Sequence, residues 1–176
     1  LELGRSFIVK EYQKKPLSLF LLWKGIMYYL LKNADYRYLI GPVSISNEFS
    51  TLSKSLIVKF IKKHFYNEEL AAHVFPKKRF KVDIDKNVDG DFIINNSDDD
   101  LNKLDKFISD IESNLKIPVL LKKYISLNAK FIGFNIDPKF NNCLDGLIIL
   151  DIFDVPDNIL KSMSKDLNDD SVLKRF

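Results

Sequence analysis

Apolar residues recur along the chain at spacings that predict alternating strands and helices. Branched and aromatic residues in 1–9 and 36–46 are typical of strands, and Gly41-Pro42 interrupts the second. The almost wholly apolar segment 17–31 predicts a helix between them, with Pro16 in its first turn. We expect this helix to be covered on most sides, because it is apolar nearly all round. A connecting helix also predicts that the two strands are parallel neighbours, which diverge near Gly41-Pro42.

The rest of the chain favours further helices and a closing pair of strands. Apolar residues from 52 to 65 have helical spacing, with four lysines, Lys54 among them, largely on the opposite face. Asn47 or Ser50 is suited to cap this helix. In the weakly patterned region 67–97, we interpret 79–84 as a strand and 86–91 as a turn. Further expected elements are helices from about 99 and from 118, strands over 129–137 and 144–153, and a polar helix from 157. This order predicts an α/β sheet with an antiparallel pair at one edge.

Composition and length place the chain among globular proteins. Apolar residues make up 46% and charged residues 29% of the 176 residues. The first residues lack the features of a signal peptide, and 17–31 is too short to span a bilayer. The lone Cys143 excludes an internal disulfide and is interpreted as core filler. We therefore expect a cytoplasmic protein that at most lies peripherally on a membrane.

Charge is distributed unevenly along the chain. Residues 1–82 hold 15 Lys or Arg against 6 Asp or Glu, whereas residues 83–176 hold 12 against 18. One interpretation is a solvated surface. The other is a basic face for an acidic partner, namely a phosphate, an anionic lipid or an acidic carrier protein, with no role for nucleic acid.

Two chemical signatures can be set aside. His64 to Glu69 has the spacing of the His-x4-Asp motif of lysophosphatidate acyltransferases, but it ends in Glu and begins on an amphipathic helix. His64 and His73 with one distant cysteine match no known metal site, so we expect no bound metal.

Three segments carry a resemblance to a known family. They are 2–7 (ELGRSF), 41–46 (GPVSIS) and 117–151, in which Pro118, Asp137, Phe140 and Asp145 fit the pattern. Together they resemble the GNAT-like lipid N-acyltransferases, which form ornithine and glycine lipids and are often labelled hemolysins. The Glu-x-Gly-Arg element is also similar to the Glu-x-Ser-Arg element of acyl-homoserine-lactone synthases, which share the fold.

The resemblance implies a GNAT-like α/β fold, a mixed sheet with flanking helices. Residues 1–9 would match its fourth strand and 36–46 its fifth, which part to form a slot for the acyl thioester. The chain would then be the C-terminal portion of the domain over 1–156, lacking the N-terminal strands, followed by a polar tail over 157–176. An edge left open in this way makes a homodimer an expected arrangement.

The resemblance also implies roles for three candidate catalytic residues. Glu2 would take the proton of the attacking ammonium, Arg5 would orient Glu2 or the acceptor's carboxylate, and Ser46 would bind the leaving thiolate or the acceptor. The alternative is a Glu2–Arg5 ion pair that only holds the strand. Strand alternation puts Glu2 and Arg5 on opposite faces unless Gly4 forms a bulge.

The donor site implied by the resemblance begins on the backbone of Phe7, Ile8 and Val9. It continues in the loop and helix start, with Gln13, Lys14, Lys15 and Ser18. CoA-using members have glycine near the position of Pro16, which offers no N–H to a pyrophosphate. This departure favours the single phosphate of acyl-phosphopantetheine on acyl carrier protein over acyl-CoA. The alternative for Lys14 and Lys15 is a solvated turn.

The function implied is N-acyl transfer in bacterial aminolipid synthesis. A long acyl chain, with or without a 3-hydroxyl group, would pass from acyl carrier protein to the amino group of an amino acid such as ornithine or glycine, with no covalently bound cofactor. Two alternatives stay open. One is a non-catalytic module that binds acyl carrier protein or a lipid surface, and the other is a CoA-dependent acetyltransferase.

Overall fold

The structure is a computed structural model of the chain, and it describes residues 1–4, 8–13, 15, 17–85, 88–112, 115–167 and 173. The helices are α1 (Ser18–Lys32), α2 (Thr51–His64), α3 (Glu68–Ala71), α4 (Gly90–Asn96), α5 (Leu101–Ile111), α6 (Val119–Ser126) and α7 (Asp157–Leu167), with short 3-10 helices η1 (Lys10–Tyr12) and η2 (Ile152–Asp154). The strands are β1 (Tyr38–Ile45), β2 (Lys130–Asp137) and β3 (Cys143–Asp151).

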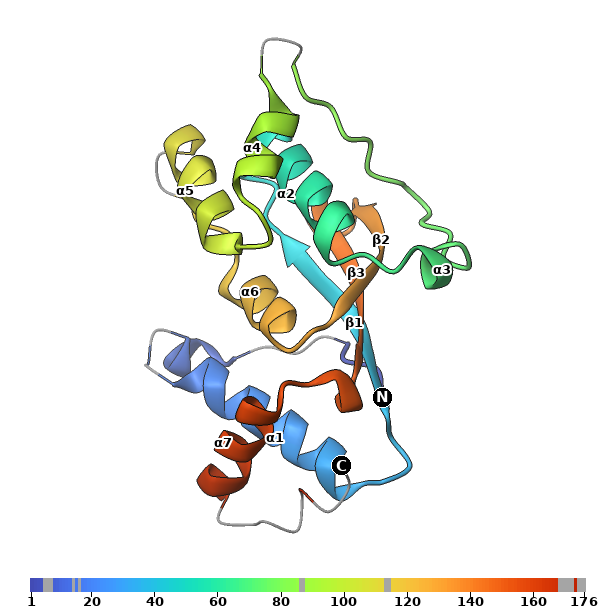
Figure 1. Cartoon of the computed structure of the whole chain (residues 1–176), viewed down its shortest axis with the longest axis vertical. Helices are drawn as coiled ribbons and strands as arrows, with labels where there is room; N and C mark the ends of the chain where they lie inside the picture. The colour runs from blue at the N-terminus through green and yellow to red at the C-terminus, as the bar shows by residue number, and fades with distance from the viewer. Residues whose placement is uncertain are drawn as a thin grey trace. The chain divides into compact units, whose positions relative to one another are not determined.

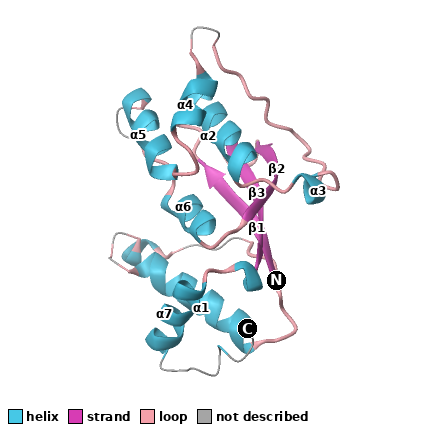
Figure 2. Ribbon diagram, in the orientation of Figure 1, coloured by secondary structure: helices cyan, strands magenta, loops and turns pink. Residues whose placement is uncertain are grey.

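The expected α/β class is confirmed. Helices flank a small sheet of order β1-β3-β2 (Figure 2), an arrangement consistent with part of a GNAT-like fold. β2 and β3 pair antiparallel from Lys130–Ile149 to Asp137–Cys143, with an irregularity between Phe131 and Gly133. The predicted closing pair of strands is thus confirmed. In the turn between them Asn141 and Asn142 both have φ 50°, a left-handed conformation that asparagine tolerates better than most residues.

By its internal contacts the chain divides into two compact units, residues 1–41 with 150–176 and residues 42–149. In the first, α1 and α7 lie side by side (Figure 1), and Lys24 donates to the Asp166 carbonyl at 2.8 Å. The Arg37 guanidinium donates two hydrogen bonds to the Asp151 carboxylate, with Nη2 2.6 Å and Nε 2.8 Å from Oδ2. The buried apolar residues of this unit include Trp23, Met27, Leu30, Leu39, Leu150 and Ile152.

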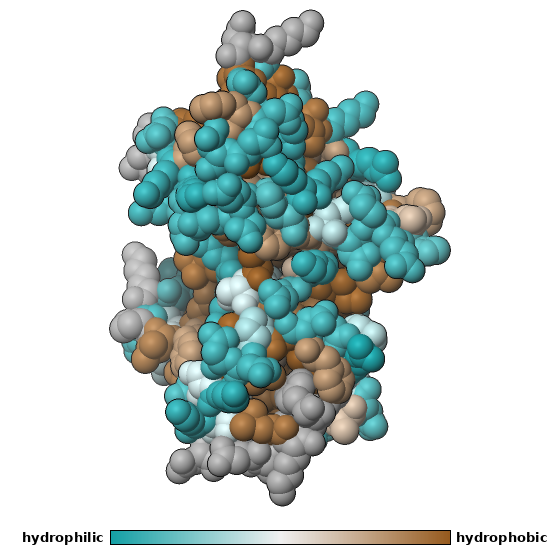
Figure 3. All heavy atoms as spheres, in the orientation of Figure 1, coloured by the Kyte–Doolittle hydropathy of each residue, from teal (hydrophilic) through white to brown (hydrophobic). Residues whose placement is uncertain are grey.

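The second unit is built around α2, which lies beside α4 and α5 (Figure 1). Ser50 caps α2 by accepting a hydrogen bond from the Ser53 amide, which confirms one of the two predicted caps. Residues 53–58 of this helix are all buried, so its apolar and small polar sides are both covered. Figure 3 shows mainly hydrophilic atoms over this part of the visible face.

Three expectations about individual elements are wrong. Lys54 is only 7% exposed and donates to Asn47 Oδ1 at 3.0 Å, so it is not on a solvated face. The helix α1 is not covered on most sides, since Phe20, Leu21 and Tyr29 are 43%, 60% and 46% exposed. Residues 79–84 form no strand; Arg79 makes an isolated bridge with Asn135 instead.

Two further segments differ from the sequence pattern. The strand expected over 1–9 is seen only as an isolated bridge at Glu2, while Lys10–Tyr12 form a 3-10 helix and residues 5–7 lie outside the described part of the chain. The helices α3 and α4 were not expected. Both begin at capping side chains, Asn67 and Asp89, which accept hydrogen bonds from Leu70 and Phe92 amides.

Candidate functional site

The start of the chain pairs in parallel with β1. Glu2 and Ile40 form a parallel bridge, in which Leu3 N–H donates to the Ile40 carbonyl at 2.8 Å and Ile40 N–H donates to the Leu1 carbonyl at 2.9 Å. The helix α1 lies between the two segments in sequence, as a crossover between parallel strands requires. The predicted parallel pairing across a connecting helix is therefore confirmed at the Glu2–Ile40 bridge, although the described residues of 1–9 form no strand around it.

Gly41 and Pro42 follow directly after this pairing. In a parallel ladder the next amide to donate after Ile40 belongs to residue 42, and proline has no N–H. Gly41 also lies against the first segment, because a Cβ built on it would be 2.5 Å from the Leu3 carbonyl oxygen. The two segments thus approach closely at Leu3 and Gly41, and Pro42 cannot donate the next hydrogen bond of a regular ladder. The predicted divergence beyond this point falls on residues 5–7, outside the described residues.

Of the candidate catalytic residues, the structure places Glu2 and Ser46. Glu2 is exposed, and its carboxylate is available beside the parallel bridge. Ser46 follows the end of β1, and its hydroxyl accepts a hydrogen bond from the Glu48 amide at 3.2 Å. Arg5 lies outside the described residues, so its predicted pairing with Glu2 stays a prediction.

The candidate donor residues that the structure describes lie around η1 and at the start of α1. Gln13 Nε2 donates to the Ile8 carbonyl at 2.9 Å, which closes the loop over η1. Lys15 Nζ lies 4.3 Å from the centre of the Tyr12 ring, and Val9 is 48% exposed. Phe7 and Lys14 lie outside the described residues, as does Pro16.

The first turn of α1 has no side-chain cap from the residue that precedes it. The helix begins at Ser18, and the residue before it, Leu17, has φ 70° and provides no side-chain cap. Initial N–H groups of a helix that lack a cap are open to water or to an anion. Leucine at positive φ is uncommon and costs conformational energy. The surrounding structure must therefore hold Leu17 in this conformation at the start of α1.

A polar cluster that the sequence did not single out lies between β1 and β3. Ser44 Oγ donates to Asp145 Oδ1 at 2.6 Å, and the Cys143 thiol lies 3.3 Å from the same oxygen. Burial, followed by the hydrogen bond and negative charge of Asp145, raises the pKa of Cys143 to about 11. The thiol is therefore protonated at neutral pH and a poor nucleophile, which agrees with its interpretation as a core residue.

His64 lies at the end of α2 among aromatic side chains. His64 is the last residue of α2, its ring lies 4.9 Å from that of Phe60, and burial lowers its pKa. Its Nε2 is buried without a hydrogen-bond partner among the described residues. Within the described ranges no three His, Cys, Asp or Glu side chains gather as metal ligands. No helix there is long and apolar enough to cross a membrane.

Comparison with known proteins supports kinship with acyltransferases. The chain is 27% identical over 151 residues to a glycine N(alpha)-acyltransferase of Bacteroides thetaiotaomicron, a match that covers 80% of this chain and 37% of that protein. It is 26% identical over 134 residues to a glycine N(alpha)-acyltransferase of Phocaeicola vulgatus, covering 72% of this chain and 40% of that protein. The chain thus spans about two fifths of the length of these relatives. No protein-family model matches the chain, and no solved structure matches it.

Proposed function

We propose that this chain contributes the donor side of an N-acyltransferase that moves a long acyl chain from acyl carrier protein to the amino group of an amino acid, with glycine the first acceptor to test. The observation that carries the proposal is the parallel pairing of residues 1–3 with Ile40, directly before Gly41-Pro42. This is the feature expected where two strands part to admit a thioester. The acceptor is suggested by the names of the two relatives.

The proposed reaction needs no covalent intermediate on the protein. The neutral amine attacks the thioester carbonyl carbon, the C–N bond forms, the C–S bond breaks, and the thiolate of phosphopantetheine leaves and takes up a proton. We propose that the Glu2 carboxylate, which is exposed, accepts the ammonium proton directly or through water. Positioning of amine and thioester, together with backbone N–H groups facing the oxyanion, supplies the rate enhancement.

The donor's phosphate is proposed to bind at the start of α1. The uncapped N–H groups of its first turn carry a partial positive charge, and Lys15 stands just before them. One helix start with one neighbouring lysine suits a single phosphate group. The chain has proline at position 16, where a glycine would offer a further N–H, so we propose acyl carrier protein as donor ahead of CoA.

Acyl transfer can be tested by incubating the protein with 3-hydroxypalmitoyl acyl carrier protein and a mixture of amino acids, followed by mass spectrometry of the lipid extract. We expect N-acylglycine as the product. The yield of N-acylglycine should be much smaller when 3-hydroxypalmitoyl-CoA replaces the acylated carrier protein as donor. N-acylornithine as the main product would correct the acceptor. A product formed only from a short-chain acyl-CoA would contradict the proposal in favour of an acetyltransferase, and carrier-protein binding without any product would favour a non-catalytic module.

A further inference from the structure

A cavity lies along the outer edge of β2, within the second unit. Two short pairings hold other parts of the chain against this edge: Tyr66 bridges Phe131 in parallel, and Arg79 bridges Asn135 antiparallel. Asn67 N–H donates to the Phe131 carbonyl at 2.9 Å, and Ile136 N–H donates to the Lys78 carbonyl at 2.8 Å. The chain between these two anchors, which includes α3, encloses a cavity of about 250 Å³ against the strand.

One side of this cavity is an ordered apolar wall. The Tyr66 ring is stacked on Phe134, with 6.2 Å between ring centres and 8° between planes, and Phe134 is stacked in turn on Phe131 at 5.7 Å. Such a stack restricts ring motion and fixes where the Tyr66 hydroxyl lies. The remaining apolar lining comes from α2, α3, the segment after α3 and β2, and includes Val58, Ala71, Val74, Pro76, Phe80 and Ile132.

Three charged side chains line the same cavity. Lys62, at 5.8 Å from the Tyr66 ring centre, and Arg79 are positive, and Glu68 is negative. Within the described part of the chain, none of the three forms an ion pair or a side-chain hydrogen bond. Burial, and then the charge of Glu68, raises the pKa of Tyr66, while Arg79 acts to lower it, so both charges lie within electrostatic reach of this hydroxyl. All three charged side chains are also exposed to solvent. Among the described residues the cavity therefore presents two cations, one anion and a hydroxyl group that have no ion-pair or side-chain hydrogen-bond partner, while Lys62 lies over the Tyr66 ring.

We infer that this cavity binds a small zwitterionic amino acid, with Lys62, Arg79 and the Tyr66 hydroxyl holding its carboxylate and Glu68 its ammonium group. A carboxylate is matched by two cations and a hydroxyl donor, and guanidinium is well suited to two-point contact with it. A simple anion would face repulsion from Glu68, so charges of both signs favour a zwitterion. That the bound amino acid is the acyl acceptor rests on the function proposed above.

The inference is tested by titrating the protein with glycine, acetate or methylammonium in the absence of any acyl donor, with binding followed by calorimetry and by protein NMR. Glycine should bind more tightly than either one-charge probe. The substitutions Arg79→Gln and Lys62→Gln should each weaken glycine binding roughly tenfold, the loss expected for one charge-assisted hydrogen bond. Glu68→Gln should make glycine no better than acetate.

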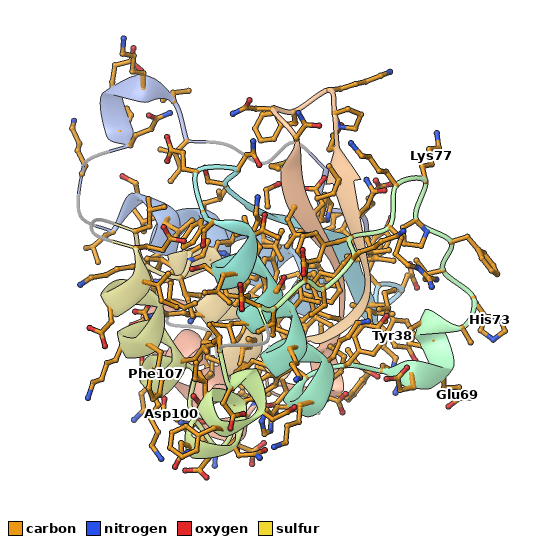
Figure 4. The ribbon with its side chains drawn as sticks, turned by 90° about the horizontal axis from the view of Figure 1, so that it is seen from above. Tyr38, Glu69, His73, Lys77, Asp100 and Phe107 are labelled. Atoms are coloured by element: carbon orange, nitrogen blue, oxygen red, sulfur yellow. The ribbon has the colours of Figure 1, made fainter. Side chains whose placement is uncertain are left out.

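Matched controls lie on the same segments. Glu69 and Lys77 are exposed, do not line the cavity, and lie on the outer side of α3 and of the segment after it (Figure 4). Glu69→Gln and Lys77→Gln should therefore leave glycine affinity unchanged. The inference is overturned if glycine does not saturate the protein, or if the control variants lose as much affinity as the cavity variants. Because no donor is present, glycine binding without acyl transfer would contradict only the proposed function, and transfer unaffected by Arg79→Gln would contradict only this inference.

Discussion

At the scale of single residues, Gly146 shows how tightly the β2–β3 pair is packed. A Cβ at this position would be 2.6 and 2.8 Å from two atoms of the Phe131 ring and 3.3 Å from the Phe134 ring. Gly146→Ala must displace the stacked rings, and we expect a loss of about 1–3 kcal/mol in the free energy of unfolding, measured with urea. Gly25→Ala is the control, since nothing lies within 4 Å and an exposed helical alanine should stabilise by about 0.5–1 kcal/mol. Equal effects of the two substitutions would show that the ring stack is not tightly packed.

Cys143 gives a second prediction at this scale. With its pKa near 11, its thiolate fraction at pH 8.5 should be small, so alkylation by iodoacetamide should be roughly 100-fold slower than in the urea-unfolded chain. Asp145→Asn should speed alkylation of the folded protein, because it removes a negative charge that raises the pKa. The unfolded thiol loses its proton first, so folding stability should fall as pH rises from about 9 through 11. Similar folded and unfolded alkylation rates would refute the raised pKa.

At the scale of elements, the pairing of residues 1–3 with β1 depends on Gly41. Gly41→Ala would place a methyl group 2.5 Å from the Leu3 carbonyl oxygen and push the two segments apart. We expect the Leu3 and Ile40 amides to lose hydrogen-exchange protection by roughly tenfold or more, as expected when a local pairing opens. The amides of the β2–β3 pair should keep their protection. Unchanged exchange at Leu3 would mean that the close approach at Gly41 does not hold the pairing.

The elements that the sequence predicted well are those whose periodicity is local. The helices α1, α2 and α5 and the strands β1, β2 and β3 each repeat a pattern over eight or more residues. The helices α3 and α4 are only four and seven residues long, too short for a periodic signal. Segment 79–84 is held by distant partners instead, as when Ser55 Oγ accepts the Asp83 amide hydrogen bond at 2.9 Å. Such contacts have no local signature in the sequence.

The burial of Lys54 could not be predicted from the sequence either, because it depends on a partner side chain outside the helix. A lysine among apolar helical positions normally indicates a solvated face, but Asn47, seven residues earlier, supplies an oxygen that compensates the buried ammonium. Periodicity does not reveal such a partner. The helix α1 shows the opposite case, because part of its apolar surface is exposed. An apolar helix sequence indicates how much helix surface is suited to burial, but it does not indicate which other element packs against that surface.

At the scale of the whole molecule, the candidate site was predicted in part. The parallel pairing at Glu2 and Ile40 followed from the helix predicted between two strand-like segments. The parting expected at Gly41-Pro42 stays a prediction, because residues 5–7 lie outside the described part of the chain. The cavity beside β2 was not predicted, because Lys62, Glu68 and Arg79 are brought together by two bridges to β2 that join residues more than 50 positions apart. Charge counts along the sequence indicated a basic N-terminal half without indicating where these charges meet.

That basic half leads to a prediction about the donor. Reversing Lys14 and Lys15 to Glu should weaken binding of acyl carrier protein by about 1–3 kcal/mol at low salt, if these side chains meet its phosphate or acidic surface. The loss should shrink as salt rises, because exposed charges are screened over about 8 Å at physiological ionic strength. Reversing Lys77 and Lys78 makes the same change in net charge elsewhere on the chain. Equal losses in the two double variants would assign the effect to net charge alone.

The central claim, that the junction of residues 1–3 with Gly41 forms part of an acyl-transfer site, is tested most directly by the rate of N-acylglycine formation in three proteins side by side. These are the wild type, Gly41→Val and Gly25→Ala, each supplied with 3-hydroxypalmitoyl acyl carrier protein and isotopically labelled glycine. Misplacement of the reacting groups should cost Gly41→Val roughly 100-fold in rate, whereas Gly25→Ala should match the wild type. No labelled product from the wild type, or equal rates for Gly41→Val and the wild type, would contradict the account.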